Sequence, residues 1–310
     1  MEAMGRSPPS VRRRRQPSRF RHGLNRWVHK IKWAALRRIF RGDIAAIQSK
    51  LSAEPFAVIL GRYPDIPLKP VRPYLTGGLN RRHRRGAVIG HYAAAARLLT
   101  DAAVVSSHTG GQQLLSVSTA EGEVTVELTG QDGLYREAEW RLLLRLDGRP
   151  ITEMGLAIVD RPLLRIDGEG QVLWIGALKS ASAGVQGLDD ARILTKAMEG
   201  LRPKSLLLLV AQALARSLDL SGLVAASNAG HVFASDHSLR RRISADYDSF
   251  WVESGGSRVR RIMFDLPITK AQRDPAEYKP NKRAQVRRRH HLELEIARRV
   301  AEAIRPMRRT

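Results

Sequence analysis

The segment YDSFWVESGG, residues 247–256, places two carboxylates beside three aromatic side chains and a pair of glycines. Aromatic surroundings remove water from a carboxyl group and raise its pKa, which suits the group to acid–base catalysis near neutral pH. Glu253 and Asp248 are therefore candidate catalytic groups. The structural alternative is that Phe250 and Trp251 fill the core while the glycines turn the chain.

His231 is a further candidate catalytic group. It follows the apolar segment LVAAS, residues 223–227, which has the composition of a buried strand. Ligand sites in open α/β sheets lie at the carboxyl ends of strands, so a histidine at this place is well positioned for chemistry. The alternative is a buried histidine with a structural hydrogen bond. Residues 235–237, Ser-Asp-His, have the residue types of a catalytic triad, but three neighbours in sequence rarely converge, and we expect a loop.

A glycine-containing connection, ASAGVQGLDD at residues 181–190, lies between an apolar strand and a helix. Backbone N–H groups at such a helix start bind phosphate. Gly184, Gln186, Gly187 and Arg192 are therefore the candidate cofactor-binding residues, for acyl-coenzyme A or an acyl carrier protein. The spacing Arg/Gln-x-x-Gly-x-Gly/Ala of acetyl-coenzyme A binders is missing, so an ordinary strand-to-helix connection is the alternative.

Several kinds of chemistry are excluded by what the chain lacks. It has no cysteine, which rules out disulfides, thiolate zinc ligands and cysteine nucleophiles. It has no GxxxxGK[ST], no GxSxG, no HExxH and no dinucleotide fingerprint. His290 and His291 lie among arginines without carboxylates at ligand spacing, so no metal site is expected.

The elements that must position these residues are predicted from hydrophobic periodicity. Alternating apolar residues separated by Asp-Gly turns predict antiparallel strands at residues 124–128, 139–146, 151–159 and 171–178. The last of these, QVLWIGAL, is apolar on both faces and is expected at the centre of the sheet.

The chain then continues as two helices, from Asp189 to Gly200 and from Pro203 onward. After them come the strand at 223–227, a strand at 259–264 and a basic helical tail. Four prolines within residues 63–73 predict an extended linker or surface crossing.

This order predicts an α+β fold, with a mostly antiparallel central sheet flanked by helices. It is similar to the GNAT-type acyltransferase fold, in which a central strand leads through a phosphate-binding turn into a helix and then a parallel strand. We expect a basic, partly disordered tail at 1–41, an α+β domain at 42–269, and a basic helical extension of that domain at 270–310.

The net charge of +23 is concentrated at the two ends, because residues 1–41 contribute +12 and residues 270–310 contribute +8. Such tails favour contact with an anionic membrane surface or nucleic acid, although basic ends are also ordinary in arginine-rich proteins from GC-rich genomes. Residues 24–40 have the spacing of a basic amphipathic helix, which is typical either of a membrane-surface helix or of a helix packed on the domain.

No export signal and no membrane span is evident. The longest apolar run, residues 206–211, is far shorter than the about 18 residues that a span requires. We expect a cytoplasmic protein, with peripheral contact at the inner membrane left open.

Several segments, taken in their order along the chain, resemble the VirK/YbjX family of bacterial proteins, a family of unknown function. They are GHYAAAARLL (90–99), YREAEWRLLL (135–144), LWIGAL (173–178), LTKAMEGLRPK (194–204), YDSFWVESGG (247–256), FDLP (264–267) and NKRAQVRRR (281–289). The resemblance implies a bacterial intracellular protein linked with virulence, envelope homeostasis and resistance to cationic peptides. It implies no catalytic residues. The family's Gln-Gly after the IGxL strand is replaced here by Lys179-Ser180, and Gln186-Gly187 comes later.

Two functions are consistent with these patterns. The first is a GNAT-like acyltransferase for an envelope-related or small amine, with the acyl donor at residues 184–192 and Glu253 or His231 as general base. The second is a noncatalytic binding or regulatory protein that uses its basic tails on anionic membrane or nucleic acid. Neither fixes the small-molecule ligand or the oligomeric state.

Overall fold

The computed structural model describes residues 33–180, 184–234 and 245–309 of the 310-residue chain. By its internal contacts the chain divides into two units, Met1–Arg41 and Gly42–Thr310. Residues 33–39 of the first unit are helical. The second unit contains the sheet and the helices that pack on it.

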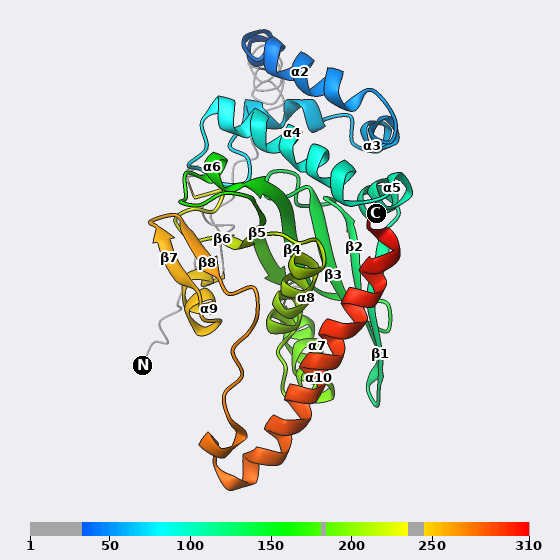
Figure 1. Ribbon diagram of the computed structural model, residues 1–310, viewed down its shortest axis with the longest axis vertical. Coiled ribbons are helices and arrows are strands. Elements are labelled where there is room, and N and C mark those ends of the chain that lie inside the picture. The colour runs from blue at the N-terminus through cyan, green and yellow to red at the C-terminus, as the bar shows by residue number, and fades with distance from the viewer. Residues whose placement is uncertain (1–32, 181–183, 235–244, 310) are drawn as a thin grey trace, which may run out of the picture. The chain divides into compact units, whose positions relative to one another are not determined.

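Within the described ranges, eight strands form a sheet in the order β1-β2-β3-β4-β5-β6-β8-β7 (Figure 1). The strands are β1 (Gln112–Thr119), β2 (Gly122–Gly130), β3 (Trp140–Leu146), β4 (Arg149–Asp160), β5 (Gln171–Ser180), β6 (Gly222–Ala226), β7 (Ser257–Arg260) and β8 (Met263–Leu266). Neighbouring strands are antiparallel except β5 and β6, which are parallel. The predicted α+β fold with a mostly antiparallel sheet is confirmed.

Helices connect and cover these strands. They are α2 (Arg41–Leu51), α3 (Phe56–Arg62), the 3₁₀ helix η1 (Ile66–Val71), α4 (Arg81–Leu98), α5 (Asp101–Thr109), α6 (Arg161–Leu164), α7 (Gly184–Ala197), α8 (Pro203–Ser217), α9 (Tyr247–Glu253), η3 (Pro275–Glu277), α10 (Pro280–Ile304) and η4 (Arg305–Met307). Figure 1 shows α8 and α10 crossing in front of the sheet. Among the helices that precede β1 in the sequence, α4 packs on β4 and α5 packs on β2.

The apolar segments form the elements that their patterns predict. Residues 172–178 of β5 are buried, as expected for a central strand covered on both faces. Helix α8 begins at Pro203, where the missing N–H of proline costs no hydrogen bond, and it is buried almost all round. The predicted meander of four antiparallel strands is present as β2 to β5, and the strand at 223–227 is present as β6.

The proline-rich stretch at residues 63–73 is not an extended linker or a surface crossing, so that prediction is wrong. Residues 66–71 form η1, and Lys69 and its neighbours are buried. Proline at the start of a helical turn is already in the right conformation, which explains the 3₁₀ turn. The turn is buried because the side chain of Lys69 bonds to Gln131 and to the carbonyl oxygen of Ala138, which lie more than sixty residues further along the chain.

Two element boundaries also differ from expectation. Helix α7 begins at Gly184 rather than at Asp189, which lies in its second turn and pairs with Arg192 at 3.2 Å. A glycine inside a helix costs only about 1 kcal/mol, and Gly187 does not delay the start. The single strand predicted at 259–264 is the hairpin β7–β8, with its turn inside that range.

β5 and β6 separate toward their carboxyl ends. Their pairing stops at Ile175 and Ala225, whereas β5 runs on beside β4 to Ser180. The register of β5 against β4 shifts at Gly176, which is a β-bulge and bends the strand where it leaves β6. A Cβ at Gly176 would lie 2.0 Å from the carbonyl oxygen of Glu137, so the close approach of these two segments requires glycine.

The first turn of α9 is fixed beside the end of β6. The side-chain oxygen of Asn228 accepts hydrogen bonds from the backbone N–H groups of Tyr247, at 2.8 Å, and Asp248, at 3.0 Å. Further along α9, the indole N–H of Trp251 donates to the carbonyl oxygen of Ala226 at 2.9 Å. These bonds determine which α9 side chains reach the gap between β5 and β6.

Candidate functional site

A cavity of about 160 Å³ lies at the carboxyl ends of β5 and β6. It is called here the His231 cavity, and its lining residues are Gly133, Glu137, Ala177, Lys179, His231, Phe233, Ala245 and Tyr247. Three of them, Glu137, His231 and Tyr247, are buried ionisable groups. They come from the segment before β3, the segment after β6 and the start of α9, so the fold gathers them from distant parts of the chain.

Glu137 is the carboxylate among the lining residues of this cavity. Burial raises the pKa of its carboxyl group, and the nearby charge of Lys179 offsets part of this effect. One carboxyl oxygen accepts a hydrogen bond from the N–H of Arg136 at 3.2 Å. A buried carboxylate with a raised pKa is well suited to take a proton from a substrate.

His231 is a neutral imidazole at physiological pH, because burial, with the charges of Lys179 and Arg136, lowers its pKa to about 4. Its Nδ1 lies 3.3 Å from the N–H of Phe233 and accepts that hydrogen bond. We therefore assign the ring hydrogen to Nε2. This assignment makes His231 a hydrogen-bond donor toward a ligand, whereas the sequence suggested a general base.

Tyr247 stacks on His231, with ring centroids 5.6 Å apart and an interplanar angle of 13°. Its hydroxyl oxygen accepts a hydrogen bond from the N–H of Leu178 at 3.3 Å, beyond the last pairing of β5 with β6. Burial raises the pKa of the Tyr247 phenol, so its own hydrogen stays in place and is available for donation. Tyr247 thus occupies the gap that the two strands leave.

A larger groove, of about 620 Å³, lies beside α7 and α8. It is called here the α7–α8 groove, and its lining residues are Thr152, Ser180, Leu188, Ala191, Arg192, Thr195, Lys196, Gly200, Arg202, Pro203, Lys204, Phe250 and Gln285. All of the charged residues among them are basic. Burial lowers the pKa of Lys204, and the neighbouring Arg202 adds to this effect. The groove therefore suits a ligand with an apolar body and an anionic group.

The groove and the cavity lie on opposite faces of the end of β5. Ser180 lines the groove and Lys179 lines the cavity, and successive strand residues point to opposite faces. Helix α9 contributes to both, since Tyr247 lines the cavity and Phe250 lines the groove. Two ligands bound in these hollows would be separated by little more than the end of β5 and α9.

The two carboxylates singled out from the sequence lie elsewhere. The side chain of Glu253 is 57% exposed and pairs with Arg202 at 3.0 Å, so the structure does not bring it together with His231. Asp248 accepts from the N–H of Asn228 at 2.7 Å and pairs with Arg258 at 2.6 Å, which is a structural role. Phe250 and Trp251 pack on each other, as the structural alternative for this segment expected.

The predicted donor-binding residues are only partly brought together. Gly184 and Gly187 lie in the first turn of α7, and Arg192 lines the α7–α8 groove while pairing with Asp189. The side chain of Gln186 and residues 235–237 lie outside the described residues. Of the predicted site, His231 and Arg192 line hollows, and the role of this turn stays a prediction.

Glu137 was missed by sequence reasoning. Its segment, YREAEW, contains this carboxylate three residues before β3 begins at Trp140, near an aromatic side chain. That is the same kind of pattern that drew attention to Glu253. The sequence has no local signal that distinguishes the buried carboxylate from the exposed one, because the difference depends on contacts with β5 and on Lys179.

A buried polar network lies near the cavity, and it joins η1 to the sheet. The Nζ of Lys69 pairs with Glu139 at 2.7 Å and donates to the carbonyl oxygen of Ala138 at 3.0 Å. The hydroxyl groups of Tyr74 and Tyr92 donate to the same carboxylate, the latter at 2.9 Å. Burial lowers the pKa of Lys69, and the charge of Glu139 opposes that effect.

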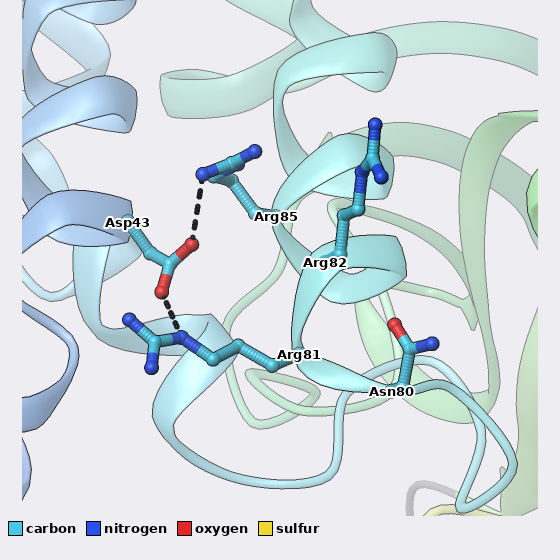
Figure 2. Close-up of a pocket in the computed structure, with 5 residues that line it drawn as sticks. All are labelled: Asp43, Asn80, Arg81, Arg82 and Arg85. Carbon is cyan, nitrogen blue, oxygen red and sulfur yellow. Dashed lines mark hydrogen bonds and ion pairs between the residues drawn. The ribbon is translucent and has the colours of Figure 1, made fainter.

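A separate open depression lies at the start of α4 (Figure 2). The buried carboxylate of Asp43 pairs there with Arg81 and, at 3.1 Å, with Arg85, while Arg82 points away from it. One acid thus lies between two of the cations. The carboxylate among its lining residues is already paired with two arginines, and the lining holds no large apolar side chain, which makes the cavity at β5 and β6 the better candidate for chemistry.

The fold and the cavity define an α+β protein with an open, mostly antiparallel sheet. In the described part of the chain, none of the helices combines the length and the apolar character needed to cross a membrane. The family model described as "Protein of unknown function (DUF535)" matches residues 22–302. An uncharacterised protein named YbjX, from Escherichia coli strain K12, is 31% identical over 245 residues, which are 76% of this chain and 71% of that protein.

The chain belongs to the DUF535 family, as the resemblance to VirK/YbjX proteins predicted. No solved structure matches the chain.

Proposed function

We propose that the protein is a GNAT-like acyltransferase, which transfers an acyl group from a thioester to an amine in the His231 cavity. The observation that carries this proposal is the convergence of Glu137, His231 and Tyr247 on one cavity at the separated ends of β5 and β6. The acceptor class is an envelope-related or small amine, and the reaction belongs in the cytoplasm.

The strand arrangement supports the proposal as an analogy of fold. A parallel pair inside an otherwise antiparallel sheet separates at a bulge, and the strand that carries the bulge leads into a helix. An arrangement of this kind lets a donor enter on one face of the sheet and an acceptor on the other. Fold alone does not define an activity, so the weight rests on the side chains of the cavity.

Each of the three groups has one task in this reaction. The free amine of the acceptor attacks the thioester carbonyl carbon, and the carboxylate of Glu137 takes the proton that the nitrogen loses. The Nε2–H of His231 donates to the carbonyl oxygen as negative charge develops on it. The C–S bond breaks, and the departing sulfur takes the hydrogen of Tyr247. Exchange with water restores Glu137 and Tyr247, and the products are an amide and a thiol.

The α7–α8 groove is the proposed donor site. Its basic residues Arg192, Arg202 and Lys204 suit the phosphates of a pantetheine-linked donor, and Leu188 and Phe250 suit its apolar part. The alternative function, in which basic tails bind anionic membrane or nucleic acid, concerns residues 1–41 and 270–310, and most of the first tail lies outside the described residues. That alternative stays a prediction.

The test is thiol release from short- and long-chain acyl-coenzyme A in the presence of a panel of amines. We expect Glu137→Gln to slow the reaction about 10²–10⁴-fold, because the general base is lost while the shape is kept. Glu253→Gln is the matched control and should keep the wild-type rate, since its carboxylate is exposed and lies outside the cavity. Equal rates for wild type and Glu137→Gln, or no thiol release with any thioester, would contradict the proposal.

A further inference from the structure

The two halves of α10 carry very different charge. Residues 279–291, its first half with the N-cap, contain six Lys or Arg residues and no Asp or Glu. Residues 292–304 contain two arginines and three glutamates. A helix that only packs on its own domain has no need of such a separation, so the basic half requires its own explanation.

The second half neutralises its charges internally. Glu295 pairs with Arg298 at 2.7 Å and with Arg299 at 2.8 Å, and Glu302 pairs with Arg298 at 2.5 Å. Glu293 pairs with Lys270 at 2.6 Å. Every acid of this half is therefore matched by a cation of the same chain.

The first half is neutralised only in part. Arg288 pairs with Glu199 at 3.1 Å, which ties the helix to the end of α7. Within the described residues, no carboxylate pairs with Lys279, Lys282 or Arg287, and all three are exposed. These cations repel one another, and their mutual repulsion would be relieved by an external polyanion.

The basic half adjoins the α7–α8 groove. Gln285 lies between Lys282 and Arg288 on α10 and lines the groove. The charged residues on the groove walls are also cations, and all of them except Lys204 pair with an acid beside the groove. An anionic partner on α10 would thus be next to a hollow that takes an apolar chain, beside Leu188 and Phe250.

The depression at the start of α4 provides a contrast. There Asp43 pairs with two of the arginines, and the lining holds no large apolar side chain (Figure 2). The two basic surfaces therefore differ in two respects. They differ in how far acids of the same chain pair with their cations, and in whether an apolar groove lies beside them. Of these two surfaces, the one on α10 has the features of a docking site for an acidic carrier of a chain-like group.

We infer that the basic half of α10 docks an acidic carrier protein, which presents an acyl group on a phosphopantetheine arm to the α7–α8 groove. This inference rests on the proposed acyl transfer and names the source of the acyl group. Single-stranded nucleic acid is disfavoured because residues 279–291 contain no Phe, Tyr or Trp on which bases would stack, and duplex DNA is compared directly in the test. A membrane surface is disfavoured because it has no single arm to fill a groove of this volume.

The test uses the full chain and measures binding of an acyl carrier protein, in its holo and acyl forms, by fluorescence anisotropy at low and at physiological salt. The variant is Lys279→Glu combined with Lys282→Glu, at two exposed positions that have no carboxylate partner among the described residues and share the helix face of Gln285. Arg82→Glu is the matched control, since this exposed arginine belongs to the other basic surface. We expect the double variant to bind the carrier at least about tenfold more weakly, and the control to bind like the wild type. Binding should also weaken with salt.

Turnover separates this inference from the proposed function. The double variant should lose turnover with the acyl carrier protein and keep it with acyl-coenzyme A, which has no protein body to dock. Carrier binding without turnover of any thioester would refute the acyltransferase proposal while the docking surface stands. The docking inference is overturned if the carrier does not bind, if the double variant binds it as well as the wild type, or if duplex DNA or phosphatidylglycerol vesicles bind the same residues more tightly than the carrier does.

Discussion

Replacing Lys69 by methionine tests how the buried network joins η1 to the sheet. The Lys69 and Glu139 side chains are both fully buried and lie 2.7 Å apart. Lys69→Met removes the ammonium group and leaves the Glu139 carboxylate, among the described residues, with the hydroxyl groups of Tyr74 and Tyr92 as partners. Methionine has nearly the volume of lysine, so little packing is lost. The uncompensated charge of Glu139 therefore lowers the free energy of unfolding more than the change in packing does.

We expect the free energy of unfolding to fall by about 3–5 kcal/mol, which is the usual cost of removing one partner from a buried pair. For a chain of this size, that loss lowers the melting temperature by about 10 °C. Equilibrium urea unfolding at pH 7.5, followed by circular dichroism, measures the change directly. The midpoint should move while the slope stays constant, since the folded state keeps its surface area.

The double variant Lys69→Met with Glu139→Gln decides between loss of charge balance and loss of packing. The glutamine keeps acceptor and donor groups for both tyrosines without a buried charge, so the double variant should recover much of the loss. Lys196→Met is the matched control, because its ion pair with Glu121 is long and exposed and should contribute less than about 1 kcal/mol. A Lys69→Met loss no larger than that of the control, or a double variant less stable than the single one, would refute this reasoning.

Two more predictions concern the core and the bulge. Burial lowers the pKa of both His108 and His231 to about 4. Between that pH and about 6.5 the unfolded state therefore binds more protons than the folded state. The free energy of unfolding should fall as the pH falls through this window, by up to about 3 kcal/mol for each histidine. Glu137, whose pKa is raised, opposes this trend in part. Urea unfolding at pH 7.5 and at pH 4.5 measures the change, and equal stabilities at the two pH values would contradict the lowered pKa of the two histidines. Gly176→Ala should cost about 1–3 kcal/mol, because its Cβ would lie 2.0 Å from the carbonyl oxygen of Glu137, whereas Gly110→Ala, with open space around it, should melt close to the wild type.

The parts of the fold that follow local periodicity were predictable from the sequence. The alternating segments became β2 to β5, and QVLWIGAL became a buried central strand because its side chains are apolar on both faces. Pro203 marked the start of α8 because proline fits the first turn of a helix and little else in that context. These features depend on neighbours within a few residues.

The remaining features depend on contacts between distant residues. Lys69 is buried because its partners lie at Gln131, Ala138 and Glu139, and a proline-rich sequence alone gives no sign of them. Glu137 and Glu253 have similar sequence surroundings, yet only the first faces a cavity. Such differences are decided by which segments meet in space, and no local pattern encodes that.

The position of α10 has a consequence for how the newly made chain acquires its structure. Helix α10 packs on β1 and α8. The residues after it bond to the connection between α4 and α5: the N–H of Thr100 donates to the carbonyl oxygen of Met307 at 2.9 Å, and the N–H of Arg309 donates to the carbonyl oxygen of Leu98 at 3.0 Å. The strand pairing of the meander is local and can form while the ribosome is still at work. The surface of α8 that α10 covers stays open until α10 itself has been synthesised, so this part of the core forms late, and a chain that stops before α10 presents that surface to chaperones and proteases.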